Sequence, residues 1–387
     1  MYALQAVNKK VLIAVVVLII AAITFYLLNF LNITSLFQRQ KNIPEIEKQP
    51  TKELTQEEIQ EIPLLSTVAK NLEVPWAIAF LPDGGMLVTE RPGRVRLIDE
   101  GDNLQKEPIA TISAVKQFGE GGLLGIALHP EFETNNFVYL YYTYAGNEDN
   151  TLNRISRFTF DKKSLEDETT IVNAIPGNRF HNGGRVKFGS DGFLYITTGD
   201  SQNPSLAQDT NSLAGKILRV TENGSPVPDN PFANLIFSYG HRNPQGIAWD
   251  NQGRLWETEH GNTATDELNL IEIGKNYGWS IIRGDQTQEG MKSPIIHSGG
   301  DTWAPSGAAF LNGSIFFAGL RGQTLFEAKI ENGSVTLVEH LKGQLGRLRE
   351  VVVGPDNMLY ITTSNRDGRG IATPDDDRII RVNPAKL

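Results

Sequence analysis

The sequence predicts an all-β protein whose main domain is a six-bladed β-propeller. With 37 glycines and 19 prolines among 387 residues, the composition favours many turns over long helices. A strand–turn–strand unit also recurs along the chain, and the turns of successive copies stand 44 to 61 residues apart. A hairpin repeated at this period is typical of propellers, which place one four-stranded sheet in each repeat.

The repeating unit consists of an apolar strand, a turn of the Pro-Asp-Gly type and a second apolar strand. Six copies are visible, at residues 77–90, 125–142, 186–199, 246–259, 307–319 and 351–363. Their turns are marked by Gly84, Asn135, Gly192, Gly253, Gly313 and Asn357. Because a closed ring leaves no unpaired end blade, we expect a strand within residues 64–74 to complete the last blade beside residues 378–383.

The amino terminus is predicted to be a membrane anchor. Lys9 and Lys10 precede an apolar run over residues 11–28 that is long enough to cross a bilayer. A cleaved signal peptide is the alternative, but it would have a shorter apolar core and a small-residue cleavage site, whereas residues 25–31 are bulky.

We therefore expect four segments: a short amino-terminal segment (1–10), a transmembrane signal anchor (11–31), a polar spacer (32–63) and the propeller domain (64–387). The two lysines favour an amino terminus inside the cell. The propeller is then expected outside the cytoplasm, in the periplasm or the extracellular space.

Composition excludes several classes of function. The formal net charge of −9 and the absence of a basic stripe argue against a nucleic-acid partner, which requires clustered Lys and Arg. Without cysteine the chain has no disulfide, thiolate metal site or cysteine nucleophile.

Four loop segments carry residue types suited to chemistry. Glu120 is a charge within a Gly-rich approach to a strand, and His181 lies in a Gly-rich turn, where an imidazole can act as a general base near neutral pH. Arg242 and Asn243 precede a proline in a third loop, and Asp266 with Glu267 downstream would suit a hard cation such as Ca²⁺.

The fourth segment is basic. Arg321 follows the fifth hairpin, and Arg347 and Arg349 are two residues apart on a predicted strand, so their side chains point the same way. Such arginines suit bidentate capture of the carboxylates of a small anionic ligand.

Taken together, these motifs resemble those of the glucose/sorbosone dehydrogenase family, quinoprotein enzymes related to soluble aldose dehydrogenases. The resemblance covers roughly residues 72–384, in the order VPWAIAFLPDG, GEGGLLGIALHPEF, HNGGRVKFGSDGFLYITTGD, AGKILRV, GHRNPQGIAW, EHG with DELNLI and NYGW, APSGAAF and GRLREVVVGPD.

The resemblance implies a propeller that binds pyrroloquinoline quinone (PQQ) and Ca²⁺ and oxidises the anomeric carbon of an aldose to a lactone. His181 is then the base that removes the hydroxyl proton, and Arg242, with Asn243 beside it, contacts the reacting quinone carbonyl. The further cofactor and metal positions implied are Arg321, Arg347 and Arg349 for the cofactor's carboxylates, the carbonyls of Gly261 and Asn262 for the Ca²⁺ at the quinone, and Glu267 with the Tyr277 carbonyl for a second, structural Ca²⁺. An external electron acceptor is also implied.

The chain departs from the glucose-oxidising members of this family at three positions. Glu120, which we assign to the substrate site, stands where they carry Gln; Phe180 stands where they carry Asp; and His260 replaces a Gln. Loss of the Asp next to the base is expected to alter the orientation of His181. Two alternative functions remain open at this point: a metal-dependent lactonase on a similar propeller, and a binding module that kept the fold and lost the chemistry.

Overall fold

The computed structural model describes residues 56–147, 150–331 and 333–387, which belong to one compact unit, Leu54–Leu387. The predicted anchor and most of the predicted spacer lie outside the described residues. Within the described ranges, no helix is long and apolar enough to span a bilayer.

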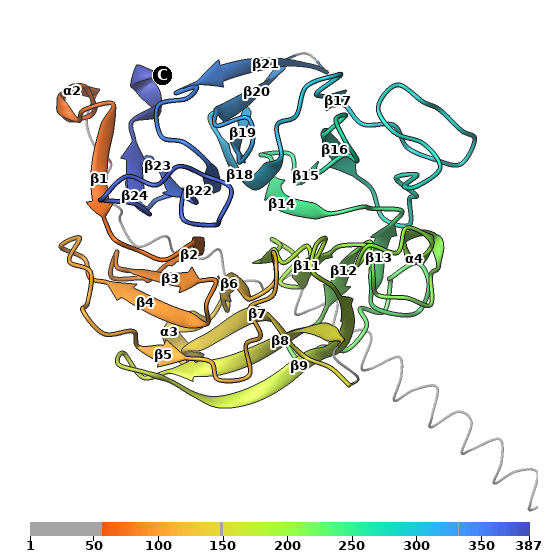
Figure 1. The fold of residues 1–387 in the computed structure, drawn as a ribbon, viewed down its shortest axis with the longest axis horizontal. Coiled ribbons are helices and arrows are strands. Elements are labelled where there is room, and N and C mark those ends of the chain that lie inside the picture. The colour runs from red at the N-terminus through yellow and green to blue at the C-terminus, as the bar shows by residue number, and fades with distance from the viewer. Residues whose placement is uncertain (1–55, 148–149, 332) are drawn as a thin grey trace, which may run out of the picture. The chain divides into compact units, whose positions relative to one another are not determined.

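The described residues form six antiparallel four-stranded sheets arranged in a ring (Figure 1), which confirms the predicted propeller. Blade 1 contains β2 (Pro75–Phe80), β3 (Met86–Glu90), β4 (Arg94–Ile98) and β5 (Ala110–Thr111). Blade 2 contains β6 (Leu123–Leu128), β7 (Phe137–Ala145), β8 (Thr151–Phe160) and β9 (Leu165–Gly177). Blade 3 contains β10 (Val186–Phe188), β11 (Leu194–Thr198), β12 (Lys216–Val220) and β13 (Ile236–Tyr239).

The other half of the ring is built in the same way. Blade 4 contains β14 (Pro244–Trp249), β15 (Leu255–Glu259), β16 (Glu267–Ile271) and β17 (Ile296–His297). Blade 5 contains β18 (Pro305–Leu311), β19 (Ser314–Gly319), β20 (Leu325–Glu331) and β21 (Ser334–His340). Blade 6 contains β22 (Leu348–Val353), β23 (Leu359–Thr363), β24 (Ile379–Val382) and β1 (Leu65–Ala69).

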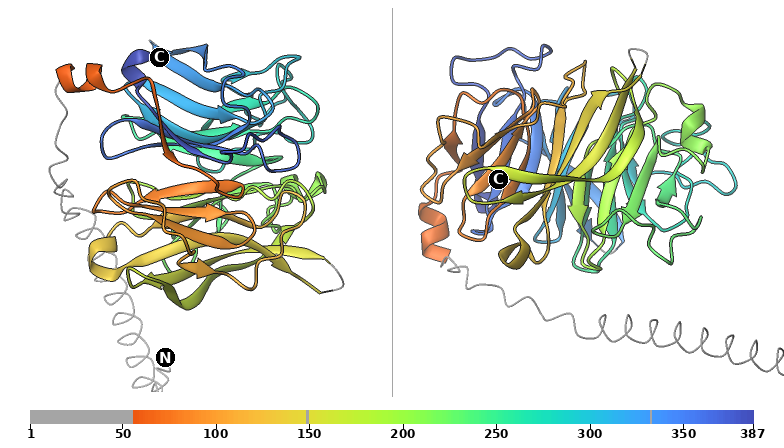
Figure 2. Two further views of the ribbon diagram at one scale, coloured as in Figure 1. Left: turned by 60° about the vertical axis from the view of Figure 1, so that its left-hand side comes forward. Right: turned by 90° about the horizontal axis from the view of Figure 1, so that it is seen from below.

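The two ends of the described chain close the ring, as predicted. β1 pairs antiparallel with β24, with Leu65 opposite Val382 and Thr67 opposite Ile380. The short helix α2 (Gln56–Glu61) lies beside the carboxyl-terminal end (Figure 2), where the Asn383 side chain donates hydrogen bonds to the carbonyls of Ile59 and Ile62. The other helical segments of the described residues are single turns: α3 (Phe132–Asn135), α4 (Ser205–Gln208) and the 3₁₀ turn Pro384–Lys386.

The hydrophobic core lies between neighbouring blades. Ile217 and Phe237 of blade 3, for example, pack in one cluster with Ile247 and Leu255 of blade 4. Each sheet therefore buries its faces only against its neighbours, which is why a single repeat would not be stable alone.

Five of the six hairpin turns follow the predicted turn chemistry. Gly192 has a φ of +78° in the turn between β10 and β11, a conformation that L-residues disfavour. The Asp191 carboxylate beside it accepts hydrogen bonds from the Phe193 amide and the Tyr195 hydroxyl, so it is a turn residue and not a ligand. The second hairpin differs, because α3 occupies its turn.

Candidate active site

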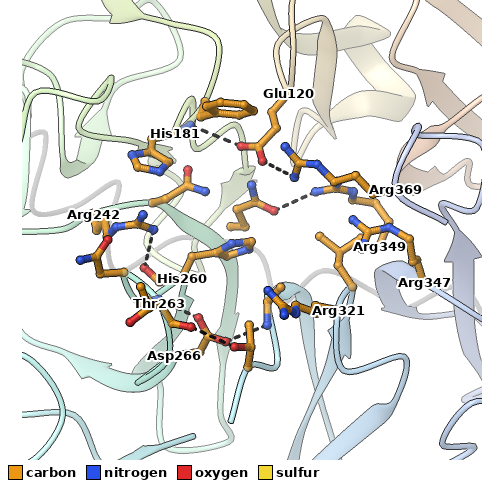
Figure 3. Close-up of a pocket in the computed structure, with 18 residues that line it drawn as sticks. Glu120, His181, Arg242, His260, Thr263, Asp266, Arg321, Arg347, Arg349 and Arg369 are labelled. Carbon is orange, nitrogen blue, oxygen red and sulfur yellow. Dashed lines mark hydrogen bonds and ion pairs between the residues drawn. The ribbon is translucent and has the colours of Figure 1, made fainter. Parts of the chain in front are cut away.

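A cavity of about 560 Å³ opens at one end of the ring. Its walls are formed by residues at or just before the start of the first strand of a blade, and by residues just after the end of a second strand. Because paired strands run antiparallel, these positions lie on the same face of the propeller. Nine of the predicted site residues line this cavity (Figure 3): Glu120, His181, Arg242, Asn243, Gly261, Asn262, Arg321, Arg347 and Arg349.

His181 is oriented by a buried carboxylate that sequence reasoning missed. The His181 Nδ1 lies 2.8 Å from Asp200 Oδ1, and the Asp200 side chain is only 1% exposed. Asp200 also accepts hydrogen bonds from the Gln202 amide and from Trp279 Nε1, both at 2.8 Å. The carboxylate therefore fixes the imidazole through Nδ1, and no other described residue hydrogen-bonds Nε2. In the sequence, the one indication of this contact was that Asp200 is the last residue of the motif that begins with His181.

Phe180 does not leave the histidine without a partner. Its ring lines the cavity beside His181, and Asp200, nineteen residues further along the chain, supplies the carboxylate. His181 itself has a φ of +60°, a left-handed conformation that is uncommon for a non-glycine residue and concentrates at functional sites.

Glu120 joins the base to a neighbouring arginine. One carboxylate oxygen accepts a 3.4 Å hydrogen bond from the His181 amide, and the other lies 2.7 Å from Arg369. Burial favours the neutral acid, but the electrostatic interactions with His260 and with the cationic Arg369 outweigh it and lower the Glu120 pKa. Glu120 is therefore a carboxylate at neutral pH. Arg369, which comes from the connection between β23 and β24, was not predicted from the sequence.

Arg347 and Arg349 both face the cavity, as the two-residue spacing predicted. Arg347 forms an ion pair with Asp367 at 2.9 Å, and Arg349 donates a 2.8 Å hydrogen bond to Gln245. Burial lowers the Arg349 pKa to about 9, so it still carries its charge at neutral pH. Arg321 is exposed at the cavity edge, and none of the described residues forms an ion pair with it.

Arg242 and Asn243 are held by a buried acid at the end of β15. Glu259 accepts hydrogen bonds from the backbone amides of both residues, at 3.1 Å for Asn243. The Arg242 guanidinium lies 5.3 Å from the centre of the Trp279 ring and donates to the His260 carbonyl at 3.3 Å. Its Nε and the Asn243 Nδ2 are buried without a hydrogen-bond partner among the described residues.

Asp266 and Glu267 do not form the joint cation site that their adjacency suggested. Neighbouring residues on a strand face opposite sides, and only Asp266 lines the main cavity. Its two oxygens accept backbone hydrogen bonds from Gly261 (2.7 Å) and Ala304 (2.8 Å), so the carboxylate shapes the Gly261–Asn262 loop. The carbonyls of Gly261 and Asn262 accept no hydrogen bond from another described residue.

Glu267 and Tyr277 line a second, much smaller cavity beneath this loop. Glu257, Glu259 and His241 lie close by, with one ligand atom of each within 4.8 Å of the others. Burial and the Glu259 charge raise the Glu257 pKa well above its ordinary value and raise the Glu267 pKa to about 8. Without a cation, the Glu267 carboxyl therefore holds a proton at neutral pH.

His260 lies in the cavity wall between the two sites. Burial lowers its pKa to about 4, with opposing contributions from Asp266 and Glu120 that favour the charged form. The imidazole is thus neutral at physiological pH, and its Nε2 has no hydrogen-bond partner among the described residues.

Comparison with known proteins identifies the family. Residues 72–373 match the family model described as Glucose / Sorbosone dehydrogenase. The chain belongs to this family. An aldose sugar dehydrogenase of Escherichia coli is 33% identical over 77% of this chain and 89% of its own length, and an uncharacterized protein of Synechocystis is 35% identical over 81% and 86%.

The glucose/sorbosone dehydrogenase fold is also shared with solved structures. The PQQ-bound form of an aldose sugar dehydrogenase from Streptomyces coelicolor superposes with a TM-score of 0.78 and 41% identity, over 82% of this chain and 96% of that one. The family that the motifs indicated is therefore confirmed.

Proposed function

We propose that this protein is a PQQ- and Ca²⁺-dependent aldose dehydrogenase that oxidises the anomeric carbon of a sugar to a lactone. The observation that carries this proposal is the placement of a carboxylate-oriented histidine in one cavity with five arginines. A base and an anion clamp are what a reaction between a sugar hydroxyl and a carboxylated quinone requires.

The hydrogen-bond donors that line the cavity suit the acceptor groups of the cofactor. Four residues that line it carry a buried polar nitrogen with no partner among the described residues: Arg242, Asn243, His260 and Arg349. Since unpaired buried polar groups are costly, and those of Arg242, Asn243 and Arg349 are donors, their concentration here indicates a ligand rich in acceptors. Arg321, Arg347 and Arg349 would hold the carboxylates, and Arg242 with Asn243 would contact the quinone carbonyl.

Two cation sites are part of this proposal. The free carbonyls of Gly261 and Asn262 are hard oxygen ligands of the kind that Ca²⁺ prefers. At the second cavity, Glu267 and the Tyr277 carbonyl would hold a structural Ca²⁺, whose charge would replace the proton that burial favours on Glu267.

The protein's own residues then perform the proton transfer. Asp200 accepts the Nδ1 proton of His181, which leaves Nε2 as the acceptor for the proton of the anomeric hydroxyl. The bound quinone supplies the hydride acceptor. Arg242 would place positive charge beside the carbonyl of a bound quinone, and the Trp279 ring packed against the guanidinium limits its movement.

The lactonase alternative lacks support from the cavity's acids. A metal-dependent hydrolase needs carboxylates free to converge on a cation, whereas Glu120 is paired with Arg369 and Asp266 accepts two backbone amides. The relatives named as dehydrogenases also favour oxidation over a binding module without activity.

The proposed location is outside the cytoplasm, with residues 11–31 as an uncleaved membrane anchor and an external acceptor receiving the electrons. Support comes from the apolar run after Lys9 and Lys10. Extraction of the full chain only by detergent, and digestion of the propeller by protease added to intact spheroplasts, would test both points.

Absorbance titration of PQQ into the Ca²⁺-loaded propeller domain, followed by dye reduction with an aldose panel, tests the activity. Saturable binding at micromolar PQQ and sugar-dependent dye reduction are expected, and His181→Ala should retain binding while losing about 10²-fold or more in rate. Absence of binding, or lactone hydrolysis without added PQQ, would overturn the proposal.

A further inference from the structure

A side cavity of about 260 Å³ adjoins the proposed reaction cavity. Both cavities are lined by Glu120, Phe180, Arg349 and Arg369, so these four side chains lie between them. The side cavity adds Arg91 and Arg179, which the proposed mechanism does not use. Four arginines thus line this space, and Glu120 and Asp367 are the only acids among the described residues that line it.

Arg91 lines this cavity, and no described residue forms an ion pair with it. The residue is 7% exposed, and its Nε is buried with no hydrogen-bond partner among the described residues. Desolvation lowers the Arg91 pKa, while Asp367 and Glu120 act in the opposite direction at longer range. A buried guanidinium that lacks a carboxylate contact is unusual, because burial of a charge is costly unless it is paired.

Two exposed arginines stand at the same cavity around Phe180. The guanidinium carbons of Arg179 and Arg369 lie 5.4 Å and 5.3 Å from the centre of the Phe180 ring. The ring thus packs near both cations at the position where the chain departs from the glucose-oxidising pattern. No described residue forms an ion pair with Arg179.

The two acids of the side cavity are already neutralised. Glu120 pairs with Arg369, and Asp367 pairs with Arg347 of the main cavity. Arg91 and Arg179 therefore remain as unbalanced positive charges in a pocket next to the base. Guanidinium groups in this state suit a phosphate or carboxylate, which they bind through charge-assisted hydrogen bonds.

The side cavity lies one side chain away from the proposed base. Glu120 contacts both the His181 amide and Arg369, and its own amide donates a 2.8 Å hydrogen bond to the Arg179 carbonyl. Gly119 permits this approach, because its φ is +61° and an added Cβ would collide with the Arg179 carbonyl. A sugar with its anomeric carbon at His181 and its other end directed past Glu120 would meet these arginines.

We propose that the preferred substrate is an aldose with an anionic group remote from the anomeric carbon, bound at Arg91, Arg179 and Arg369. This inference rests on the dehydrogenase function proposed above and specifies its substrate class. The anion is either a phosphate, as in an aldose 6-phosphate, or a carboxylate, as in a uronic acid.

Steady-state oxidation of D-glucose 6-phosphate, D-glucuronate and D-glucose by the PQQ- and Ca²⁺-loaded protein provides the first test. At least one anionic sugar should show a kcat/KM about tenfold or more above that of glucose, mainly through KM, and the advantage should shrink in high salt. Which of the two is preferred separates phosphate from carboxylate recognition. Oxidation of glucose without any preference for anionic sugars would overturn this inference alone, whereas bound PQQ with no sugar oxidised would overturn the proposed function.

Arg179→Gln probes the subsite with little risk to folding, since the side chain is exposed. It should reduce the anionic-to-neutral ratio of kcat/KM about tenfold, the loss typical of one charge-assisted hydrogen bond. Arg157→Gln is the matched control, because Arg157 also stacks on a phenylalanine ring, at 4.2 Å from Phe137, but lines neither cavity. Weaker PQQ binding in Arg179→Gln, with the ratio unchanged, would instead assign the side cavity to the cofactor.

Glu120→Gln should have the opposite effect, because it releases Arg369 from its ion pair and so raises the anionic-to-neutral ratio. Direct binding gives a readout independent of turnover. In calorimetry with the loaded protein, 1,5-anhydroglucitol 6-phosphate should bind more tightly than 1,5-anhydroglucitol if phosphate is preferred, and Arg179→Gln should remove the difference. Equal affinities together with a kinetic preference for the phosphate sugar would contradict the assignment of the subsite.

Discussion

Replacement of Asp200 by Asn tests the proposed base most directly. In the structure one carboxylate oxygen accepts from His181 Nδ1 and the Gln202 amide, and the other accepts from Trp279 Nε1. An asparagine has one acceptor oxygen in place of two, so it must turn its NH₂ group toward either the imidazole or the indole donor. The substitution therefore breaks at least one of these contacts with almost no change in volume.

The size of the effect follows from the contact that is lost. A hydrogen bond to a charged group contributes about 1.5–3 kcal/mol, and 1.36 kcal/mol changes a rate tenfold. We therefore expect Asp200→Asn to reduce kcat/KM by about 10- to 10²-fold, less than the loss on removal of the base itself. PQQ affinity should be unchanged, because Asp200 is not among the residues that line the cavity.

Dye reduction at saturating acceptor, with protein loaded with PQQ and Ca²⁺, measures the loss. Trp279→Phe removes the indole hydrogen bond but also reduces the ring that packs against Arg242, so it serves as a partial control. Because Asp200 is proposed to act through His181, adding Asp200→Asn to His181→Ala should lower the residual rate by less than about threefold. Full additivity of the two losses, or a single-variant loss below threefold, would refute the role assigned to Asp200.

Three further predictions concern the cofactor, the buried acids and the core. Arg321→Gln should raise the PQQ dissociation constant about tenfold with an unchanged melting temperature, measured by absorbance titration and calorimetry, since this exposed side chain has no structural partner among the described residues. In Ca²⁺-free protein the Glu267 pKa is raised from 4.5 to about 8, so the folded state retains a proton that the unfolded chain releases. The unfolding free energy, measured by urea titration, should therefore fall as pH rises from about 5 to 8. Glu267→Gln should make this fall smaller. Lys216→Met should cost at least about 2 kcal/mol of unfolding free energy, because the buried Lys216 amino group is hydrogen-bonded to three carbonyls, whereas exposed Lys342→Met should cost under about 0.5 kcal/mol.

The propeller could be predicted because its signals are local. Each hairpin is encoded by period-two alternation on either side of a turn residue, and the number of repeats then sets the number of blades. Ring closure also followed from the surplus strand at each end. The most specific site residues lie at strand ends, so the hairpin positions located His181, Arg242 and Arg349 on the same face as soon as the fold was known.

The partners of these residues could not be predicted from the sequence. Arg369 meets Glu120 across 249 positions of the chain, and Asp367 meets Arg347 from a different connection of the same blade. The sequence around a charged loop residue does not indicate which oppositely charged residue it will pair with in the folded protein. For the same reason, the Phe180 substitution suggested a disturbed base, although Asp200 orients it from the segment that follows β11.

The placement of the base depends on glycines whose function is packing. In the Gly-rich turn that carries His181, a Cβ at Gly183 would collide with the Thr197 carbonyl of β11. Gly199, immediately before Asp200, lies against the His181 carbonyl in the same way. Because neither position tolerates a side chain, the loop that carries His181 is pressed onto the end of β11, where Asp200 begins the next turn. The close approach of these two backbones, more than the identity of the residue at position 180, therefore determines which carboxylate the histidine meets.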